Sequence, residues 1–178
     1  NPYTYENEID NYKQDHFQLH WNEKINNYWS FNLGLNYTDG RGYFEQYKED
    51  DDINTYGGIV KSDIDSNGNE TGTTDLIRRR WLDNDFYVLN SSINYIKDKI
   101  DLTLSSSYSS YVGDHYGEVI WARSLSNTGE IRDRYYEGLG EKKDLSFFAK
   151  LLYSINKKTE LYTDIQFRGV KYNTSGTT

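Results

Sequence analysis

Cysteine is absent from this chain of 178 residues. The chain can therefore form neither a disulfide framework nor a thiolate metal site, and a cysteine nucleophile is excluded. The sequence also lacks any apolar run close to the roughly 18 residues that a membrane-spanning helix requires. If the protein meets a membrane, we expect it to do so through β-strands.

Positive charge is also scarce, since 20 Lys and Arg face 28 Asp and Glu, a formal net charge of -8. This balance argues against nucleic-acid binding, because neutralising phosphates requires a basic stripe. Hydrophobic residues make up only 35% of the chain, whereas aromatic residues reach 16%. A polar yet aromatic-rich composition is typical of neither an ordinary globular core nor a disordered tail.

Alternation with a period of two is the clearest pattern in the sequence. Between Tyr28 and Thr38, one face carries apolar side chains and the other carries small or polar ones, which predicts a half-buried strand. The apolar residues of this segment are Trp29, Phe31, Leu33, Leu35 and Tyr37. A similar run lies just before it, so the two predict a β-hairpin over residues 11–38.

The same plan recurs twice, in hairpins predicted over residues 82–111 and 143–172, with tight turns at Lys97-Asp98-Lys99 and Asn156-Lys157-Lys158. Long polar segments, 39–80 and 112–142, separate the three hairpins. All short connections therefore lie at one end and both long ones at the other. Outer-membrane barrels show this asymmetry, with short periplasmic turns and longer extracellular loops. We predict an all-β, antiparallel up-and-down meander of about six strands, a segment of a larger transmembrane β-barrel.

Alternation alone leaves a second interpretation open. A soluble, secreted β-sandwich that binds carbohydrate or another ligand also alternates, with its apolar face turned inward. In a barrel, Trp21 and Trp29 near the turns, and Tyr37 and Tyr108 near the loops, are expected to form two interfacial aromatic girdles. A sandwich requires two facing sheets, whereas a barrel segment requires sequential pairing.

Candidate ligand contacts are expected in the long loops, because binding residues concentrate in loops on a rigid scaffold. The aromatic and cationic candidates are Tyr43, Tyr47, Tyr56, His115, Tyr116, Trp121 and Arg123. Arg78, Arg79 and Arg80 lie where the first loop re-enters the sheet, and they are candidates for lipid or lipopolysaccharide phosphates at a barrel rim. A rim that simply stays hydrated is the alternative.

Metal sites have weaker support. Asp63, Asp65 and Asn67 match the opening of a calcium loop, but position twelve is Thr74 rather than Glu, so a solvated turn is the competing interpretation. His16 and His20, four residues apart on one strand, stand about 13 Å apart, too far to share an ion. The acidic run 49–52 is typical of a solubilising loop. We expect no metal and no cofactor.

Catalytic signatures are not found. The serine-rich run 104–108 lacks a nucleophile-elbow context, and the sequence holds neither a phosphate-binding glycine motif nor a zinc-ligand spacing. We therefore expect a non-enzyme.

Four stretches resemble the barrel region of TonB-dependent outer-membrane receptors, particularly those of Bacteroides-like bacteria. They are residues 1–8 (NPYTYENE), 15–19 (DHFQL), 42–47 (GYFEQY) and 113–123 (GDHYGEVIWAR). The resemblance implies a plugged barrel of 22 strands in the outer membrane of a Gram-negative bacterium. Such a receptor imports a scarce nutrient, such as a ferric siderophore, haem or cobalamin, with energy from the TonB complex.

Residues 1–178 depart from that pattern by omission. Six strands are fewer than the eight of the smallest typical bacterial barrel, and neither a plug domain nor a TonB-contacting segment is found. The segment is therefore expected to be a partial barrel domain. A sheet with two open edges and a lipid-facing surface is expected to associate with itself when isolated in water.

Overall fold

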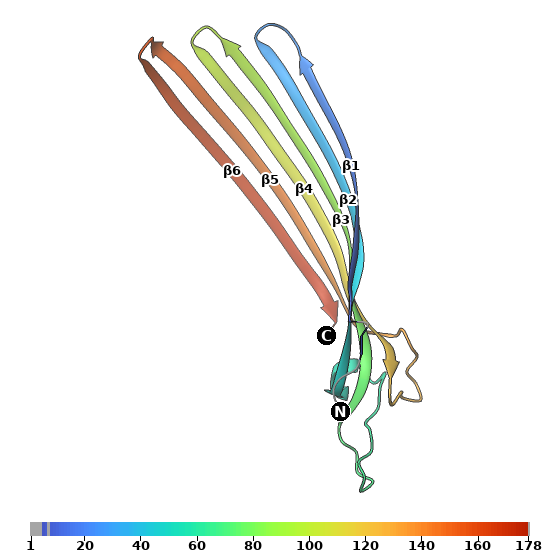
Figure 1. Ribbon diagram of the computed structural model, residues 1–178. Coiled ribbons are helices and arrows are strands. Elements are labelled where there is room, and N and C mark those ends of the chain that lie inside the picture. Colours follow the sequence, from blue (N-terminus) through green and yellow to red (C-terminus); the bar gives the residue numbers. More distant parts are fainter. Residues whose placement is uncertain (1–4, 7, 178) are drawn as a thin grey trace.

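The computed structural model describes residues 5, 6 and 8–177, and the rest of the stretch 1–8 that contributed to the resemblance lies outside the described residues. Six antiparallel strands form one sheet in sequential order (Figure 1). They are β1 (Asp10–Lys24), β2 (Trp29–Asp52), β3 (Thr73–Lys97), β4 (Ile100–Ala122), β5 (Arg134–Asn156) and β6 (Thr159–Thr177). The predicted all-β meander is thus confirmed. Over the described residues there is no second, facing sheet such as the sandwich interpretation requires.

Helical structure is confined to one 3-10 turn, η1 (Ile53–Tyr56), among the described residues. Its N-cap Asp52 accepts a hydrogen bond from the backbone N–H of Asn54 at 2.9 Å, and Gly57 ends it with a left-handed φ of 58°. In the part of the chain that the structure describes, no helix combines the length and the apolarity needed to cross a membrane.

Short turns join the strands within each hairpin. In the first, the Asn26 side chain accepts hydrogen bonds from the backbone N–H groups of Tyr28 and Trp29 at 2.8 and 3.0 Å. In the second, Asp98 adopts a left-handed φ of 50°. Asn156 plays the same role as Asn26 in the third, accepting from the N–H of Lys158 at 2.9 Å. Side-chain hydrogen bonding by Asn thus closes two of the three turns.

Strand boundaries at the other end differ from the predicted ones. Residues 39–52 and 73–80, expected in the first loop, belong to β2 and β3, and residues 112–122 and 134–142, expected in the second, belong to β4 and β5. The loops therefore shrink to 53–72 and 123–133. Alternation does not reveal these extensions because, as described below, both faces of the sheet carry polar and aromatic residues there.

We call the segments next to the short turns the turn half of the sheet; these are residues 17–24, 29–37, 87–97, 100–108, 145–156 and 159–167. The remainder of each strand is the loop half. The register places Leu35 beside Leu19 on one side and Leu89 on the other, and Asn36 beside Gln18 and Val88. We call the face with Leu35 the apolar face and the face with Asn36 the polar face, because neighbouring residues of a strand point to opposite sides.

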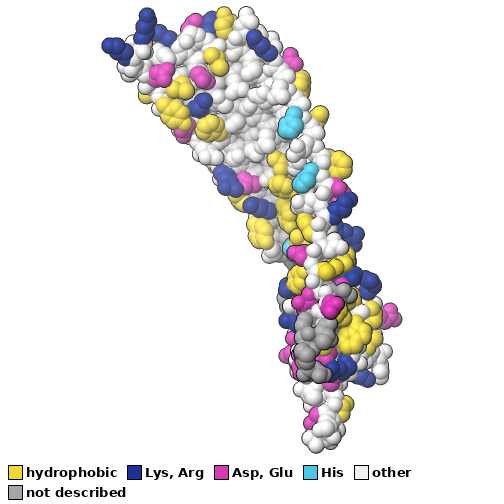
Figure 2. Space-filling view, viewed as in Figure 1, with side chains coloured by type: hydrophobic (Ala, Val, Ile, Leu, Met, Phe, Trp, Pro, Cys, Tyr) yellow, Lys and Arg dark blue, Asp and Glu magenta, His cyan; other side chains and the backbone are white. Residues whose placement is uncertain are grey.

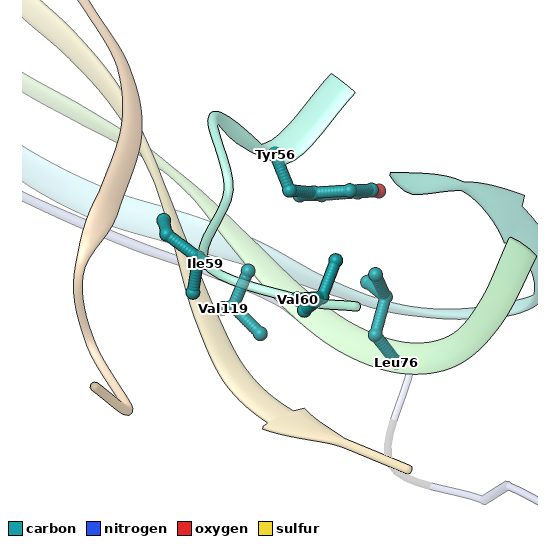
Figure 3. Packing of buried hydrophobic residues seen from close by; sticks show 5 residues of the cluster. All are labelled: Tyr56, Ile59, Val60, Leu76 and Val119. Carbon is teal, nitrogen blue, oxygen red and sulfur yellow. The ribbon is translucent and has the colours of Figure 1, made fainter. Parts of the chain in front are cut away.

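A small hydrophobic cluster anchors the two loops to the loop half (Figure 3). Tyr56, Ile59 and Val60 of the first loop pack against Leu76 of β3 and Val119 of β4. Leu76 lies on the polar face because it is an even number of residues from Asn84 along β3. Val119 shares that face because it pairs with Arg78, which is also an even number of residues from Asn84. The first loop therefore folds over the polar face at the end of the sheet.

Candidate functional site

An exposed band of apolar side chains crosses all six strands of the turn half. The band stays exposed because nothing in the described structure covers this face, and Phe17, Phe167 and Ile165 keep 61%, 62% and 71% of their surface. Its members are Phe17, Leu19, Trp21, Trp29, Phe31, Leu33, Leu35, Tyr37, Tyr87, Leu89, Ile93, Tyr95, Ile100, Leu102, Leu104, Tyr108, Leu145, Phe147, Ala149, Leu151, Tyr153, Leu161, Ile165 and Phe167. An apolar patch of this extent marks an interaction surface.

Aromatic rings bound the band at both ends. Trp29 packs on Tyr95 beside the turns, with ring centroids 4.6 Å apart. At the opposite margin Tyr37 stacks on Tyr87 at 4.8 Å and on Phe17 at 5.9 Å. The expected girdle residues Trp29, Tyr37 and Tyr108 thus lie at the two margins, whereas Trp21 lies nearer the middle of the band, beside Leu33.

Two serines interrupt the band near its middle. Ser91 and Ser106 face each other across β3 and β4, and their hydroxyl oxygens lie 2.8 Å apart. Each hydroxyl therefore has a partner without water, as an apolar environment requires.

Small and polar side chains cover the opposite face of the turn half. Asn32 donates to Ser92 across β2 and β3 at 3.0 Å, and Gln18 donates to Asn36 across β1 and β2 at 3.1 Å. Figure 2 shows a broad area of this half in which neither apolar nor charged side chains dominate. His20 belongs to this face, as does His16, whose Nδ1 lies 2.9 Å from the Thr38 hydroxyl. The polar surface is thus suited to water.

Charged residues begin abruptly at the loop-side margin of the apolar band. Asp15, Asp39 and Asp85 lie side by side in the next row of the apolar face, and Glu141 lies in the same row on β5. The Tyr37 hydroxyl donates to Asp85 at 2.6 Å. Further out, Arg41 pairs with Asp83 at 3.3 Å. The loop half therefore carries charged side chains on this face too.

Two of the aromatic ligand candidates, Tyr43 and Tyr116, gather beyond this charged margin together with the rim candidate Arg79. Tyr43 packs on Trp81 at 4.6 Å between ring centroids, and Trp81 stacks on Tyr116 at 5.9 Å. Arg79 lies over Tyr43, and Arg134 lies over Tyr116 at 3.7 Å. Sequence reasoning missed Trp81 and Arg134 as members, although the cross-strand register would have revealed them. Each arginine also pairs with a glutamate, Glu45 or Glu137.

Arg78, Arg79 and Arg80 do not form one cationic surface. Because they are consecutive in β3, Arg79 lies on the apolar face and the other two on the polar face. Arg78 is half-buried, 3.8 Å from the Asp51 carboxylate, and donates to Gln46 and to the Tyr56 hydroxyl at 3.0 Å each. Only Arg79 therefore faces the same side as the apolar band, and its partner Glu45 lies 2.7 Å away.

Tyr56 and Arg123 serve as loop anchors in this structure. Tyr56 is fully buried and donates to Asp51 at 2.6 Å. Burial and this hydrogen bond raise the pKa of its hydroxyl. Arg123 pairs with Asp63 at 3.1 Å and with Asp75, and so joins the end of β4 to the first loop and to β3.

Asp75 is the centre of this anchor. Its carboxylate is 2% exposed and accepts hydrogen bonds from the Tyr47 hydroxyl at 2.6 Å, the Asp50 backbone N–H at 3.0 Å and the Arg123 guanidinium. Burial alone would raise the pKa of Asp75, but these hydrogen bonds and the positive charge lower it below its ordinary value. The hydrogen bond to Asp75, with burial, raises the pKa of Tyr47 to about 12.

The remaining candidates lie apart. His115 is exposed on the polar face of β4, whereas its neighbour Tyr116 lies on the apolar face. Trp121 is 44% exposed near the end of the same strand. In the possible calcium loop, Asp65 accepts backbone hydrogen bonds from Asn67 and Asn69 at 2.8 Å each. Asp63 accepts from Thr74 and Ser124 as well as pairing with Arg123. No group of three or more His, Cys, Asp or Glu side chains placed to hold a metal occurs among the described residues.

Comparison with known proteins identifies no relative: no protein-family model matches the chain, and no curated protein matches it.

Proposed function

We propose that the sheet forms part of the wall of a β-barrel in the outer membrane of a Gram-negative bacterium. The apolar face contacts lipid, and the polar face lines the lumen. The observation that carries this proposal is the exposed apolar band, which is bounded by aromatic rings at both margins and backed by hydrogen-bonded polar residues. This combination is the pattern of transmembrane barrels.

The height of the band supports the assignment. Trp29 to Tyr37, Tyr87 to Tyr95, Ile100 to Tyr108 and Leu145 to Tyr153 are each about nine residues long, which matches the 9–11 residues of a tilted membrane-spanning strand. Each of β2 to β5 has at least 23 residues. The loop half therefore projects beyond the membrane, and there both faces meet water.

Further strands are needed on both sides. β1 and β6 are the edges of the sheet and run antiparallel to each other, so antiparallel strands added to either edge would continue the same alternation. An unpaired backbone edge in lipid leaves hydrogen-bonding groups unsatisfied, which is why only closed barrels span membranes. Isolated in water, the sheet is expected to self-associate through these edges and the apolar band.

Within this proposal, the complete protein is a TonB-dependent importer of a ferric siderophore, haem or cobalamin. This part of the proposal rests on the resemblance of the loop and strand sequences to those of TonB-dependent receptors. The lumen-facing polar residues and the projecting loop half would contribute to nutrient capture, with energy supplied by the TonB complex. In the producing bacterium, deleting the gene should abolish growth on one of these nutrients supplied as sole source. Unchanged growth on all three would refute import.

Lipid contact is testable with two neighbouring residues of β5. Phe147 lies on the apolar face near the middle of the band, and Phe148 lies on the polar face. In the complete protein, Phe147→Arg should destabilise the membrane-inserted barrel by about 2–4 kcal/mol, because arginine is costly at the bilayer midplane. Phe148→Arg, the matched control, should insert into lipid vesicles like the unmodified protein.

The readouts are protection of the strands from protease in vesicles and the denaturant midpoint of the inserted protein. Preferential loss of insertion by Phe147→Arg supports the barrel wall. Equal effects of the two substitutions would show that lipid does not distinguish the faces, and the proposal would be wrong.

A further inference from the structure

Arg80 is the one arginine of the chain that forms no ion pair within the described structure. The other arginines are paired as Arg41 with Asp83, Arg78 with Asp51, Arg79 with Glu45, Arg123 with Asp63 and Asp75, Arg132 with Glu118, Arg134 with Glu137, and Arg168 with Asp144. In an acidic protein, where carboxylates outnumber cations, an unpaired arginine stands out.

Two aromatic rings hold the Arg80 guanidinium in place. Its central carbon lies 5.6 Å from the ring centroid of Phe44 on β2 and 5.5 Å from that of Tyr136 on β5. The Arg80 Nε donates a hydrogen bond to the Tyr136 hydroxyl at 3.1 Å. These contacts occupy the flanks and one nitrogen of the exposed guanidinium, and its two terminal amino groups make no hydrogen bond within the described structure.

Gly117 makes this arrangement possible. It separates Arg80 from Tyr136 in the row that crosses β3, β4 and β5. A Cβ atom at residue 117 would collide with the rings of Tyr135 and Tyr136. Because glycine lacks that atom, Tyr136 can lean across β4 and reach the guanidinium.

Negative charge is sparse around Arg80 on this face. Along its own row, Asp10 is the nearest acid, two strands away and therefore about 10 Å distant across the sheet. The next row toward the turns carries Leu82, His115 and Gly138, without a carboxylate. Asp83 and Asp114, which flank this row along their strands, belong to the apolar face. Toward the loops, the adjoining row of the polar face carries Arg78, which is itself paired with Asp51. No carboxylate of the described structure is thus paired with the Arg80 guanidinium.

Two glycines leave room on the polar face of β5. A Cβ atom at Gly138 or Gly140 would meet no other atom closer than 3.8 Å. They follow Tyr136 toward the turns, two strands away from Arg80. The polar face next to Tyr136 is therefore open to an approaching molecule.

We propose that Arg80, held between Phe44 and Tyr136, is a binding site for an oxyanion, the carboxylate or phosphate group of a ligand. The inference rests on the proposed function, because the proposed function places this face at the mouth of the lumen. Arginine binds such groups through two parallel hydrogen bonds, and a stacked guanidinium loses little freedom on binding. An aromatic ring of the same ligand would have the Phe44 and Tyr136 rings next to it, on either side of the Arg80 guanidinium.

The test is a titration of the complete protein, folded in detergent micelles, with citrate and, separately, inorganic phosphate, at constant ionic strength. Chemical shifts of the arginine side-chain N–H groups report binding. The Arg80 signals are expected to shift, and Arg80→Gln should weaken binding by about tenfold or more, since charge-assisted hydrogen bonds are lost. Tighter binding of citrate assigns the site to carboxylates, and tighter binding of phosphate assigns it to phosphates.

Two further variants make the result specific. Gly117→Ala keeps every charge but displaces Tyr136, so it should also weaken binding. Arg41→Gln is the matched control, because Arg41 lies over the Trp81 ring at 5.2 Å yet is paired with Asp83 on the apolar face. Its substitution should leave the affinity unchanged.

Failure of this inference is distinguishable from failure of the barrel proposal. If neither anion shifts the Arg80 signals, or if Arg80→Gln and Arg41→Gln weaken binding equally, the oxyanion site is refuted. The contrast between Phe147→Arg and Phe148→Arg does not depend on that outcome.

Discussion

The Tyr37 hydroxyl donates a hydrogen bond to the Asp85 carboxylate at 2.6 Å, and this contact joins two different environments. The ring of Tyr37 belongs to the apolar band, where it stacks on Tyr87. Asp85 belongs to the first charged row beyond it, beside Asp39. A tyrosine with an apolar ring and a hydroxyl directed to a charged row is what a membrane interface favours.

Under the proposed barrel assignment, this boundary predicts how deep in the membrane each of the four tryptophans lies. Trp21 and Trp29 lie within the band, and Trp81 and Trp121 lie in the loop half. In variants that retain one tryptophan each, with the others replaced by Phe, lipids brominated on their acyl chains should quench the first two and not the others. Strong quenching of Trp81 would place the membrane on the wrong part of the sheet.

The same boundary contains a like-charge contact that should cost stability. Asp39 lies between Asp15 and Asp85 in the ladder, and its side chain makes no hydrogen bond or ion pair within the described structure. Asp39→Asn should raise stability by roughly 0.5 kcal/mol, because like charges directly opposite each other repel. Denaturant midpoints measure the effect. Asp85→Asn is the control and should lower stability, since it weakens the hydrogen bond from Tyr37.

Acid should release the first loop through Asp75. The folded-state pKa of this carboxyl lies below its ordinary value of 3.8, because hydrogen bonds from Tyr47 and Arg123 outweigh the effect of burial. The contribution of Asp75 to the stability of the anchored loop is therefore complete above about pH 4 to 5, and it is lost as the pH falls through the lowered pKa. Protease cleavage within 53–72 should rise in that acidic window.

Asp75→Asn should make the same loop sensitive to cleavage at neutral pH and remove the acid dependence that Asp75 causes. Glu70→Gln, a change at an exposed acid in the same loop, serves as the control and should leave cleavage at neutral pH unchanged. Equal cleavage of the two variants at pH 7 would show that Asp75 does not hold the loop.

Tyr56 should separate hydrogen bonding from packing in the loop cluster. Tyr56→Phe keeps the buried ring and removes the contacts to Asp51 and Arg78, at a cost of about 1–3 kcal/mol. Tyr56→Ala also empties the space beside Val119, at a cost of about 3–5 kcal/mol. Hydrogen exchange at the Lys61 and Ser126 amides, which bond across the two loops, reports local opening. Exchange in the turn half should stay unchanged.

Different physical signals explain why one half of the sheet was predictable and the other was not. In the turn half, one face is apolar and the other polar, so Leu33 and Leu35 alternate with Asn32 and Asn36 and reveal strand and register. In the loop half both faces carry polar, charged and aromatic side chains. Adjacent aromatics such as Tyr43 and Phe44 then occupy opposite faces without any visible alternation, and the strands were predicted too short.

The candidate residues follow the same division. Seven loop candidates were chosen for their chemistry, and the structure gathers Tyr43 and Tyr116 around Trp81 while it buries Tyr56 and pairs Arg123. Residue type could not separate these roles, because each depends on partners from other strands.

By itself, the sequence determined the number and order of the strands, their short turns and the apolar face of the turn half, because these depend on residues that are neighbours along the chain. Only the tertiary structure decided how the loops anchor and which arginine of the described residues stays unpaired. Arg78, Arg79 and Arg80 are consecutive residues of the same type, so the sequence alone does not distinguish them. Cross-strand register gives the first two carboxylate partners and gives Arg80 two aromatic rings instead.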